Sequence, residues 1–213
     1  MPNWAYSQTT ITGPKESLKK MLDHGKDHIR HFSDGDAITM GSWFPRPETY
    51  DKYDTTNYPN GEKLVIGGKY NDEPITEELI ERFKQATKEQ KEKYGAVGWY
   101  EWNCKNYGCK WDCPIDIVEA EDKAEFLIKS PWGIPDVWFE SMSKMYPDLV
   151  FTVKADYELD DAWYLLEWRN GVFTQLDSGY YEYEEVSPEE AAKIAAEIKE
   201  KILDTPSDDS LPF

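Results

Sequence analysis

The feature that most constrains the fold is the segment 148–186, in which strand-like runs are joined by short turns. Residues 151–158 alternate apolar and polar side chains, which gives a strand one buried face and one polar face. Turn signals follow at Asp160-Asp161 and at Asn170-Gly171. Because such short turns join antiparallel neighbours, this segment predicts a largely antiparallel sheet.

Helical patterns alternate with further strand patterns over the rest of the chain. The sequence predicts strands at 6–12 and 124–130, and helices from 15 toward 32, from 76 to 94, from 135 to 146 and from 187 to 203. The helices carry apolar stripes, as Leu79, Ile80 and Phe83 illustrate. The sequence therefore predicts an α+β sandwich in which helices pack on one face of the sheet.

The length of 213 residues suits one sizeable domain with its own core, so we expect a single α+β domain over residues 1–213. Residues 44–74 are rich in Pro, Gly, Asn, Asp and Tyr and contain only one strand-like run, KLVIGG. They are therefore expected to form a loop-rich insertion. The tail at about 204–213 is expected to fray.

The chain is strongly acidic, because 42 Asp and Glu residues against 24 Lys and Arg residues give a formal net charge of −18. Such a charge repels phosphate backbones, so nucleic-acid binding is not expected, whereas a basic protein partner would be attracted. The N-terminus has no basic start followed by an apolar run, and no window reaches the length of a membrane span. We therefore expect a cytoplasmic protein with no membrane partner.

The stretch WYEWNCKNYGCKWDC, residues 99–113, holds all three cysteines and three of the nine tryptophans. Zinc sites usually pair cysteines across two intervening residues, whereas the spacings here are four and three residues. In an extended segment Cys109 and Cys113 would lie roughly 13 Å apart, too far to chelate one ion. If residues 106–108 form a three-residue hairpin loop, Cys104 and Cys109 point to opposite faces, whereas a four-residue loop that begins at Lys105 would place them directly across from each other. The sequence leaves the choice between these loops open. Free thiols that pack as small apolar side chains are the favoured interpretation.

The aromatic residues of this stretch allow two interpretations. Trp99, Trp102 and Trp111 could stack nucleobases on an exposed sheet, but such platforms normally lie in basic grooves. Their acidic neighbours favour a role in the core or in a protein contact, where tryptophan is enriched. We expect Trp102 and Trp111 to be substantially buried, with Gly108 at a turn.

The three histidines are His24, His28 and His31, and their spacing would place them on one side of a continuous helix. Such a face could bind a metal ion. Against this, Gly25 interrupts the helical pattern and the adjacent basic residues indicate a solvated face. We therefore predict no metal site there.

No nucleophile elbow, phosphate-binding glycine loop, dinucleotide fingerprint or zinc-protease signature occurs. Asp156, Glu158, Asp160 and Asp161 could pair for acid–base chemistry or bind Mg²⁺. A polar strand face that runs into an acidic turn is the commoner explanation. The sequence therefore predicts no catalytic, cofactor-binding or metal-ligating residue and favours a non-enzymatic protein.

Several short motifs occur in an order that is similar to one known family: MPNW, TITGP, FPRPE, NYGCKWD, SPWGIP and MYPDLVFTVKADYE. The chain thereby resembles small phage and plasmid proteins with a YubB-type ferredoxin-like domain. This resemblance implies a ferredoxin-like sandwich without an iron–sulfur cluster, in the cytoplasm of a bacterial host cell. It implies no activity, since none is established for the family.

One motif departs from the family's pattern. Members typically carry Trp-Gly-Thr-Lys-Trp where this chain has residues 107–111, Tyr-Gly-Cys-Lys-Trp. The aromatic ring and the glycine are retained in kind. Cysteine in place of threonine argues against a catalytic hydroxyl at this position and against a general metal role for Cys109.

The sequence and the resemblance together predict a non-enzymatic, acidic phage or mobile-element protein that binds a host or phage protein. One form of this function is a decoy for a basic nucleic-acid-binding surface, as in anti-defence. The alternatives are a nucleic-acid-binding module with an aromatic sheet platform and a metal-dependent hydrolase or nuclease that uses Asp156, Glu158 and Asp161 with Mg²⁺. The oligomeric state is left open. The candidate partner-binding residues are Trp99, Trp102, Tyr107, Trp111, Asp156, Glu158, Asp160 and Asp161.

Overall fold

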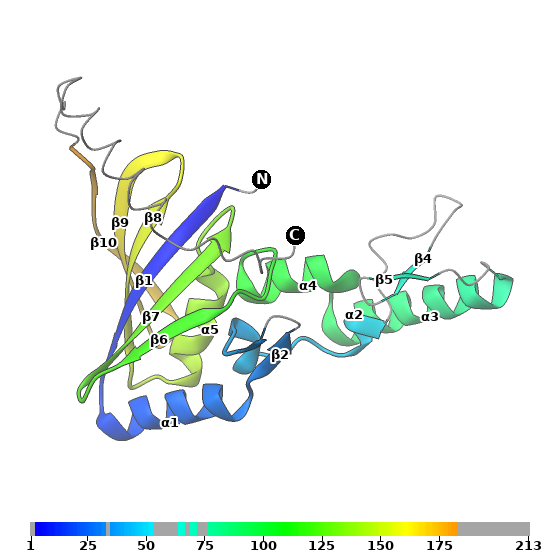
Figure 1. Cartoon of the computed structure of the whole chain (residues 1–213), viewed down its shortest axis with the longest axis horizontal. Helices are drawn as coiled ribbons and strands as arrows, with labels where there is room; N and C mark the ends of the chain where they lie inside the picture. The colour runs from blue at the N-terminus through cyan, green and yellow to red at the C-terminus, as the bar shows by residue number, and fades with distance from the viewer. Residues whose placement is uncertain (1–2, 33–34, 53–63, 67–68, 72–75, 183–213) are drawn as a thin grey trace, which may run out of the picture. The chain divides into compact units, whose positions relative to one another are not determined.

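The computed structural model describes residues 3–32, 35–52, 64–66, 69–71 and 76–182 (Figure 1). In chain order the elements are β1 (Trp4–Thr12), α1 (Lys15–Asp27), β2 (Arg30–Phe32), β3 (Gly35–Ala37), the 3₁₀ helix η1 (Met40–Ser42), α2 (Thr49–Lys52), β4 (Leu64–Ile66), β5 (Lys69–Asn71), α3 (Glu77–Tyr94), α4 (Gly98–Tyr107), β6 (Ile115–Glu119), β7 (Lys123–Pro131), α5 (Asp136–Met145), β8 (Val150–Tyr157), β9 (Asp160–Arg169) and β10 (Val172–Tyr180).

The chain divides into two compact units, Met1–Tyr180 and Tyr181–Phe213, and all of these elements belong to the first. The second unit lies almost wholly outside the described residues, as do the predicted helix at 187–203 and the tail. One domain over the whole chain therefore stays a prediction. Within the predicted insertion, residues 64–66 of the strand-like run KLVIGG form β4, and much of the rest lies outside the described residues.

The main sheet has six strands in the order β10-β9-β8-β1-β7-β6, and every neighbouring pair is antiparallel. At its centre, Thr9 of β1 lies opposite Phe126 of β7 and Val153 of β8. The alternation predicted for β8 is confirmed, because Phe151, Val153 and Ala155 are fully buried while their neighbours are not. The prediction of an α+β fold with an antiparallel sheet is thus confirmed.

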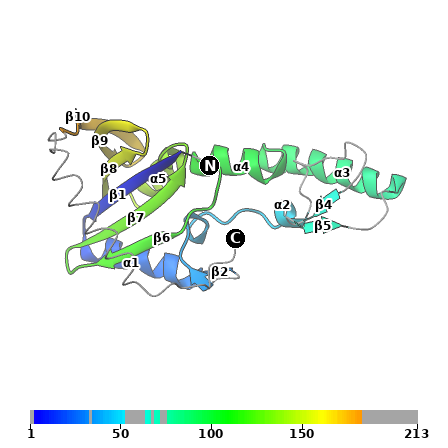
Figure 2. The ribbon, with the colours of Figure 1, turned by 45° about the horizontal axis from the view of Figure 1, so that its top comes forward.

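The core lies on one face of this sheet, against α1 and α5, and is built largely from aromatic rings (Figures 1 and 2). The ring of Trp138 on α5 lies 5.7 Å from that of Trp43 and 6.5 Å from that of Phe126. Both indoles are satisfied in the core, because Trp138 Nε1 donates to the Met40 carbonyl at 3.1 Å and Trp43 Nε1 donates to that of Met21 at 3.0 Å. These bonds join η1 to α5 and to α1.

Helix α1 ends at Asp27, so the prediction that it extends toward residue 32 is wrong. Residues 30–32 instead pair with residues 35–37 as a short hairpin. Gly25 has a packing role near the end of the helix, since a Cβ there would lie 2.3 Å from the Trp43 ring. The sequence signal was the glycine itself, which marks a close approach as well as a weak helix position.

The two predicted turns after β8 differ in outcome. Asn170 and Gly171 form the β9–β10 turn with φ values of 47° and 77°, which is the geometry that Asn-Gly favours in two-residue hairpins. The turn between β8 and β9 lies at Glu158-Leu159, so its prediction at Asp160-Asp161 is wrong by two residues. Asp160 instead begins β9 and faces Tyr157.

No helix among the described residues is long and apolar enough to cross a membrane.

Candidate functional site

Residues 99–107 of the cysteine and tryptophan stretch lie in helix α4, and residues 108–113 follow it without regular structure, so the expected hairpin is wrong. Gly108 ends the helix in the left-handed conformation, with φ 82°, and its N–H donates to the Cys104 carbonyl at 3.2 Å. Glycine is the usual residue at this position of a helix end. The turn predicted at Gly108 is therefore real, but it closes a helix.

The aromatic residues of α4 divide between core and surface. Trp102 is only 7% exposed, which confirms its predicted burial, whereas Trp111 is 36% exposed and its predicted burial is wrong. Tyr107 is fully buried, and its hydroxyl donates to the Phe44 carbonyl at 2.7 Å. Burial raises the pKa of Tyr107 far above its ordinary value. Trp102 and Tyr107 thus support the fold and do not form an exposed contact surface, while Trp99 is half-buried.

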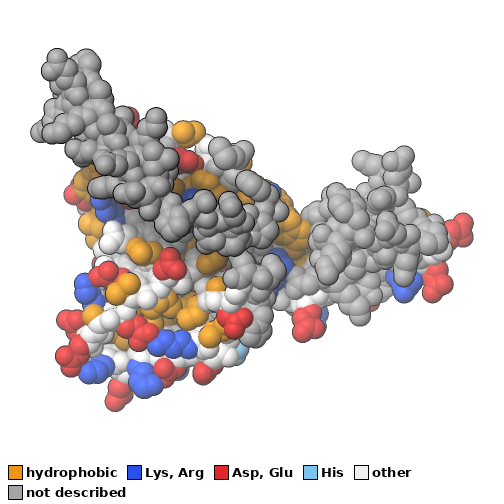
Figure 3. Space-filling view, viewed as in Figure 1, with side chains coloured by type: hydrophobic (Ala, Val, Ile, Leu, Met, Phe, Trp, Pro, Cys, Tyr) orange, Lys and Arg blue, Asp and Glu red, His pale blue; other side chains and the backbone are white. Residues whose placement is uncertain are grey.

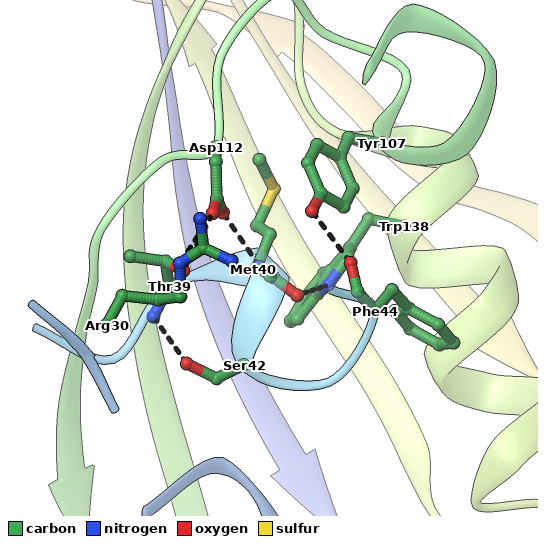
Figure 4. A network of polar contacts seen from close by, with 9 residues as sticks. Arg30, Thr39, Met40, Ser42, Phe44, Tyr107, Asp112 and Trp138 are labelled. Carbon is green, nitrogen blue, oxygen red and sulfur yellow. Dashed lines mark hydrogen bonds and ion pairs between the residues drawn. The ribbon is translucent and has the colours of Figure 1, made fainter. Parts of the chain in front are cut away.

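A buried carboxylate that sequence reasoning did not single out follows this helix (Figure 4). Asp112 Oδ1 accepts the Gly41 N–H at 2.7 Å, and Oδ2 accepts the Thr39 hydroxyl at 3.1 Å. The Arg30 Nε lies 4.0 Å from Oδ2. Burial raises the pKa of Asp112, against the opposing effect of these hydrogen bonds and of nearby Arg30 and Arg46. The contacts tie the segment after α4 to η1.

All three cysteines are free thiols. The segment from Cys109 to Cys113 is not extended, so the separation of roughly 13 Å expected for a strand is wrong. Both thiols point at one carbonyl group, that of Trp111, at 3.3 and 3.5 Å. The hydrogen bond with Cys113 and burial raise the pKa of Cys109 far above its ordinary value, which makes its thiol unreactive.

The histidines do not share a helix face as their spacing predicted. His24 lies in α1, His28 follows its last residue and His31 belongs to β2. The His24 and His28 rings are 5.1 Å apart, and His24 Nδ1 lies 2.7 Å from the Tyr146 hydroxyl. Burial lowers the pKa of His24. Across the described part of the chain, no group of three or more His, Cys, Asp or Glu residues could hold a metal ion.

The four predicted carboxylates do not converge. Asp156 pairs with Tyr6 of β1, and its side chain lies on the sheet face away from the core. Asp161 directly precedes the buried Ala162 in β9, so its side chain lies on that same outer face. Glu158 lies in the turn, where its Oε2 accepts the Trp4 N–H at 2.9 Å. Asp160 points to the core side. The three-carboxylate site expected for a metal-dependent hydrolase is therefore not formed by these residues.

Asp160 lines a pocket between α5 and the core-side faces of β8, β9 and β10, which we call the α5–β10 pocket. Its volume is about 710 Å³, and none of its lining residues is Lys or Arg. Carboxylates and aromatic rings dominate the lining: Asp136, Glu140, Asp160, Tyr157, Tyr164, Trp168 and Phe173. Volumes of about 300 to 1,000 Å³ are typical of ligand sites, so this pocket is large enough to hold a ligand.

The ring positions in the pocket are set by ring-to-ring contacts. Trp168 stacks on the buried Phe139 with centroids 5.2 Å apart and an interplanar angle of 27°. The Phe173 ring lies 5.0 Å from the Trp168 ring. Tyr157 and Tyr164 meet edge to face at 5.9 Å. These contacts hold the walls in place before any ligand arrives.

The carboxylates of the pocket act on the pKa values of its two tyrosines. Burial raises the pKa of Tyr157, and the nearby Tyr164, Asp136 and Asp160 raise it further. The pKa of Tyr164 is raised mainly by the charge of Asp160, whose Oδ2 accepts the Tyr164 hydroxyl at 3.4 Å. Both tyrosines therefore stay protonated at neutral pH.

Exposed apolar side chains lie along β10, an edge strand of the described sheet, and one of them, Phe173, lines the pocket. We call them the β10 rim: Val172, Phe173, Leu176 and Tyr180. Trp132, next to a pocket-lining glycine, is 63% exposed and has a φ of 70°, unusual for a residue with a side chain. Edge strands with exposed apolar side chains are typical of surfaces that bind other chains.

A second surface lies at the start of β1, on the sheet face away from the core. The Trp4 ring is 5.7 Å from that of Trp111, and Lys129 Nζ lies 4.5 Å from the Trp4 ring and 5.5 Å from that of Tyr6. We call Trp4, Tyr6, Trp111 and Lys129 the Trp4 patch. Sequence reasoning missed Trp4 and Tyr6, although their alternation with buried Ala5 was the available signal.

The molecular face in Figure 3 carries charges of both signs. Acidic and basic side chains are interspersed over α1 and the adjoining ends of β6 and β7. Several of them form exposed ion pairs, such as Lys26 with Glu119 at 2.5 Å and Lys15 with Glu121 at 3.2 Å. The α5–β10 pocket differs from this mixed surface because its lining contains carboxylates and no basic side chain.

Comparisons with known proteins assign no family to the chain. No protein-family model matches it, and no curated protein matches its sequence. Among solved structures, the crystal structure of protein api92 from Yersinia pseudotuberculosis, of family model DUF1281, aligns over 87% of this chain and 100% of its own with 8% sequence identity. The TM-score is 0.39, which is too low to support a shared fold or function.

Proposed function

We propose that this protein is non-enzymatic and binds a basic segment of a protein partner through the α5–β10 pocket and the β10 rim. The observation that carries the proposal is the pocket lining, in which carboxylates and aromatic rings occur without a Lys or Arg residue. The net charge of −18 favours the encounter with a basic partner.

The β10 rim supports the proposal from a different direction. Burial of Phe173 and its rim neighbours against a partner would remove exposed apolar area from water, which is the main source of affinity in most protein contacts. In the sheet of the described residues β10 has one neighbour, β9, so its other edge could also pair with an extended partner segment. Of the predicted partner-binding residues, the proposal assigns Asp160 to the contact, whereas Trp102 and Tyr107 are buried in the core.

The finer parts of the proposal come from the sequence motifs. We infer a ferredoxin-like sandwich of the YubB type and an origin in a phage or plasmid, with action in the cytoplasm of the bacterial host. In one form of the proposed function, this chain is a decoy that occupies the basic surface of a nucleic-acid-binding protein.

The experiment is affinity capture with matched variants. The tagged chain is compared with Phe173→Ser at the pocket and with Val118→Ser on β6, the opposite edge strand, whose side chain has a similar exposure (54% against 53%). We expect the wild type and Val118→Ser to retain one basic protein that raised salt releases, and Phe173→Ser to lose it. Equal capture by all three folded proteins, or capture that salt does not affect, would contradict the proposal.

A nucleic-acid-binding module is the second candidate function, and the Trp4 patch favours it. There a lysine ammonium group lies over the half-buried Trp4 ring and the exposed Tyr6 ring, as in surfaces that stack bases. The proposed function predicts no binding of labelled single-stranded RNA or DNA at low salt. Binding that disappears in folded Trp4→Ala and Trp111→Ala variants would establish the second candidate instead.

A further inference from the structure

We propose that the α5–β10 pocket is a receptor for one protonated Lys or Arg side chain, with Asp160 as its anchoring carboxylate. The inference deepens the proposed function and rests on it, since it names the chemical group that the partner would insert. It is carried by the charge balance of the pocket, the arrangement of its rings and its volume.

Of the three carboxylates in the pocket lining, two are compensated by neighbouring groups and one is not. Glu140 already forms an ion pair with Lys144 on the outer turn of α5. Asp136 accepts the Val137 N–H at 2.8 Å at the N-terminus of α5, where the helix dipole stabilises a negative charge. These two carboxylates are therefore compensated.

Asp160 differs because its described partners are neutral. Its Oδ1 accepts the Ala162 N–H at 3.1 Å and its Oδ2 accepts the Tyr164 hydroxyl at 3.4 Å. In the described part of the chain, no ion pair to a Lys or Arg side chain forms at this carboxylate. Each carboxylate oxygen can accept a further hydrogen bond, so a single ammonium or guanidinium group would complete the site.

The rings select an organic cation over a metal ion. Hard divalent cations bind several oxygen ligands, and no group of three or more His, Cys, Asp or Glu residues in the described part of the chain could hold a metal ion. Four of the twelve lining residues are aromatic. The faces of Trp, Tyr and Phe attract ammonium and guanidinium groups within about 6 Å of the ring. Phe173 at the mouth and Tyr164 beside Asp160 are placed to contact the alkyl chain and the charged end of one inserted side chain.

The pocket volume indicates how many residues of a partner chain the pocket can hold. About 710 Å³ exceeds what a single side chain needs, so residues that flank the inserted one would also lie in the pocket mouth, along β10. An extended basic segment therefore fits better than an isolated small cation, which should bind only weakly.

The test uses the full chain and small probes of stated chemistry. The indole ¹H–¹⁵N signal of Trp168 is followed during titration with n-butylammonium, n-butylguanidinium and, as a neutral analogue, n-butanol. We expect saturable shifts with a Kd on the order of 1 mM for at least one cation and none for butanol. Asp160→Asn should weaken binding about fivefold or more, because the charge-assisted hydrogen bonds are lost.

Two further variants separate a binding defect from a folding defect. Phe173→Leu keeps an apolar side chain but removes the ring, and should weaken cation binding about two- to threefold. Asp116→Asn, which removes an exposed carboxylate on β6, should leave binding unchanged. Butanol binding as tightly as the cations, or wild-type affinity in folded Asp160→Asn, would overturn the inference.

The outcome is distinguishable from that of the proposed function. If neither cation shifts Trp168 while the Phe173-dependent capture persists, this inference fails and the proposed function stands. If the cations bind at Asp160 but no basic partner is captured, the pocket is a cation site and the proposed function fails.

Discussion

Replacement of Asp112 by alanine tests how the segment after α4 is held in place. The side chain of this aspartate is only 13% exposed, and it joins the segment after α4 to η1 through hydrogen bonds from the Gly41 N–H and the Thr39 hydroxyl. Both donors belong to buried residues, so alanine would leave them without their acceptor.

The size of the effect follows from these two bonds. Hydrogen bonds to a charged group contribute about 1.5 to 3 kcal/mol each, and removal of a buried carboxylate also removes its desolvation cost, which offsets part of the loss. We therefore expect Asp112→Ala to lower the free energy of unfolding by about 2 to 4 kcal/mol. For a chain of this size, that corresponds to a fall in Tm of about 5 to 15 °C.

The assay is urea unfolding followed by tryptophan fluorescence, with Asp116→Ala as the matched control. Asp116 is an exposed carboxylate four residues further along, so its replacement should change the free energy of unfolding by no more than about 0.5 kcal/mol. A loss for Asp112→Ala as small as that of the control would refute the argument that this network holds η1.

The pH dependence of the same variant pair provides a second check. Because the pKa of Asp112 is raised in the folded chain, the folded state binds this proton more tightly than the unfolded state does. Its contribution to stability is therefore greatest below the ordinary Asp pKa of 3.8 and is lost as the pH rises through the folded pKa. The stability of the wild type relative to Asp112→Asn should fall over that window, and a rise would contradict the pKa direction.

Three further results are expected. Trp102→Ala should cost about 3 to 5 kcal/mol in urea unfolding and Trp111→Ala less than about 1.5, because only the first ring is core; the reverse order would count against the burial assignment. A thiol reagent should label half-exposed Cys104 first and the two buried thiols only on unfolding, whereas equal rates for all three would be inconsistent with the fold. Gly108→Ala should cost about 1 to 3 kcal/mol in thermal unfolding, because a Cβ at φ 82° meets a carboxylate oxygen at 2.2 Å, while Gly133→Ala, with open space around it, should be nearly neutral.

The sequence predicted those elements that depend on interactions between residues close together in the chain. The period-two alternation gave β8, and the Asn-Gly pair gave the β9–β10 turn, because each signal acts within a few residues. Helix α3 follows from acidic residues in its first turn and from Gly95 after its last residue.

Helix α4 was missed because its sequence carries no clear helical stripe. Aromatic residues occur throughout the segment, and they favour strands as readily as buried helices. The glycine at its end fits a hairpin turn and a helix end equally well. Contacts with Tyr50 and Phe44, which are far away in the sequence, decide between the two.

The candidate site depends on contacts that no single stretch of sequence reveals. Asp136 begins α5, Asp160 begins β9 and Phe173 lies in β10, and only the folded sheet brings them to one pocket. Asp160 was singled out as part of an acidic run, but the turn two residues earlier than predicted is what separates it from Asp156 and points it to the core side.

The most direct test of the central claim is site-specific photo-crosslinking in living cells that produce the protein. A photoreactive amino acid replaces the pocket-lining Gln175 in one variant and the exposed Asp116 of β6 in the other, and the crosslinked peptides are sequenced by mass spectrometry. We predict that the variant at 175 crosslinks to one partner within a segment rich in Lys and Arg, and that the variant at 116 does not. Crosslinks to the same peptides from both positions, or to segments without basic residues, would contradict the assignment of the α5–β10 pocket as the partner-binding site.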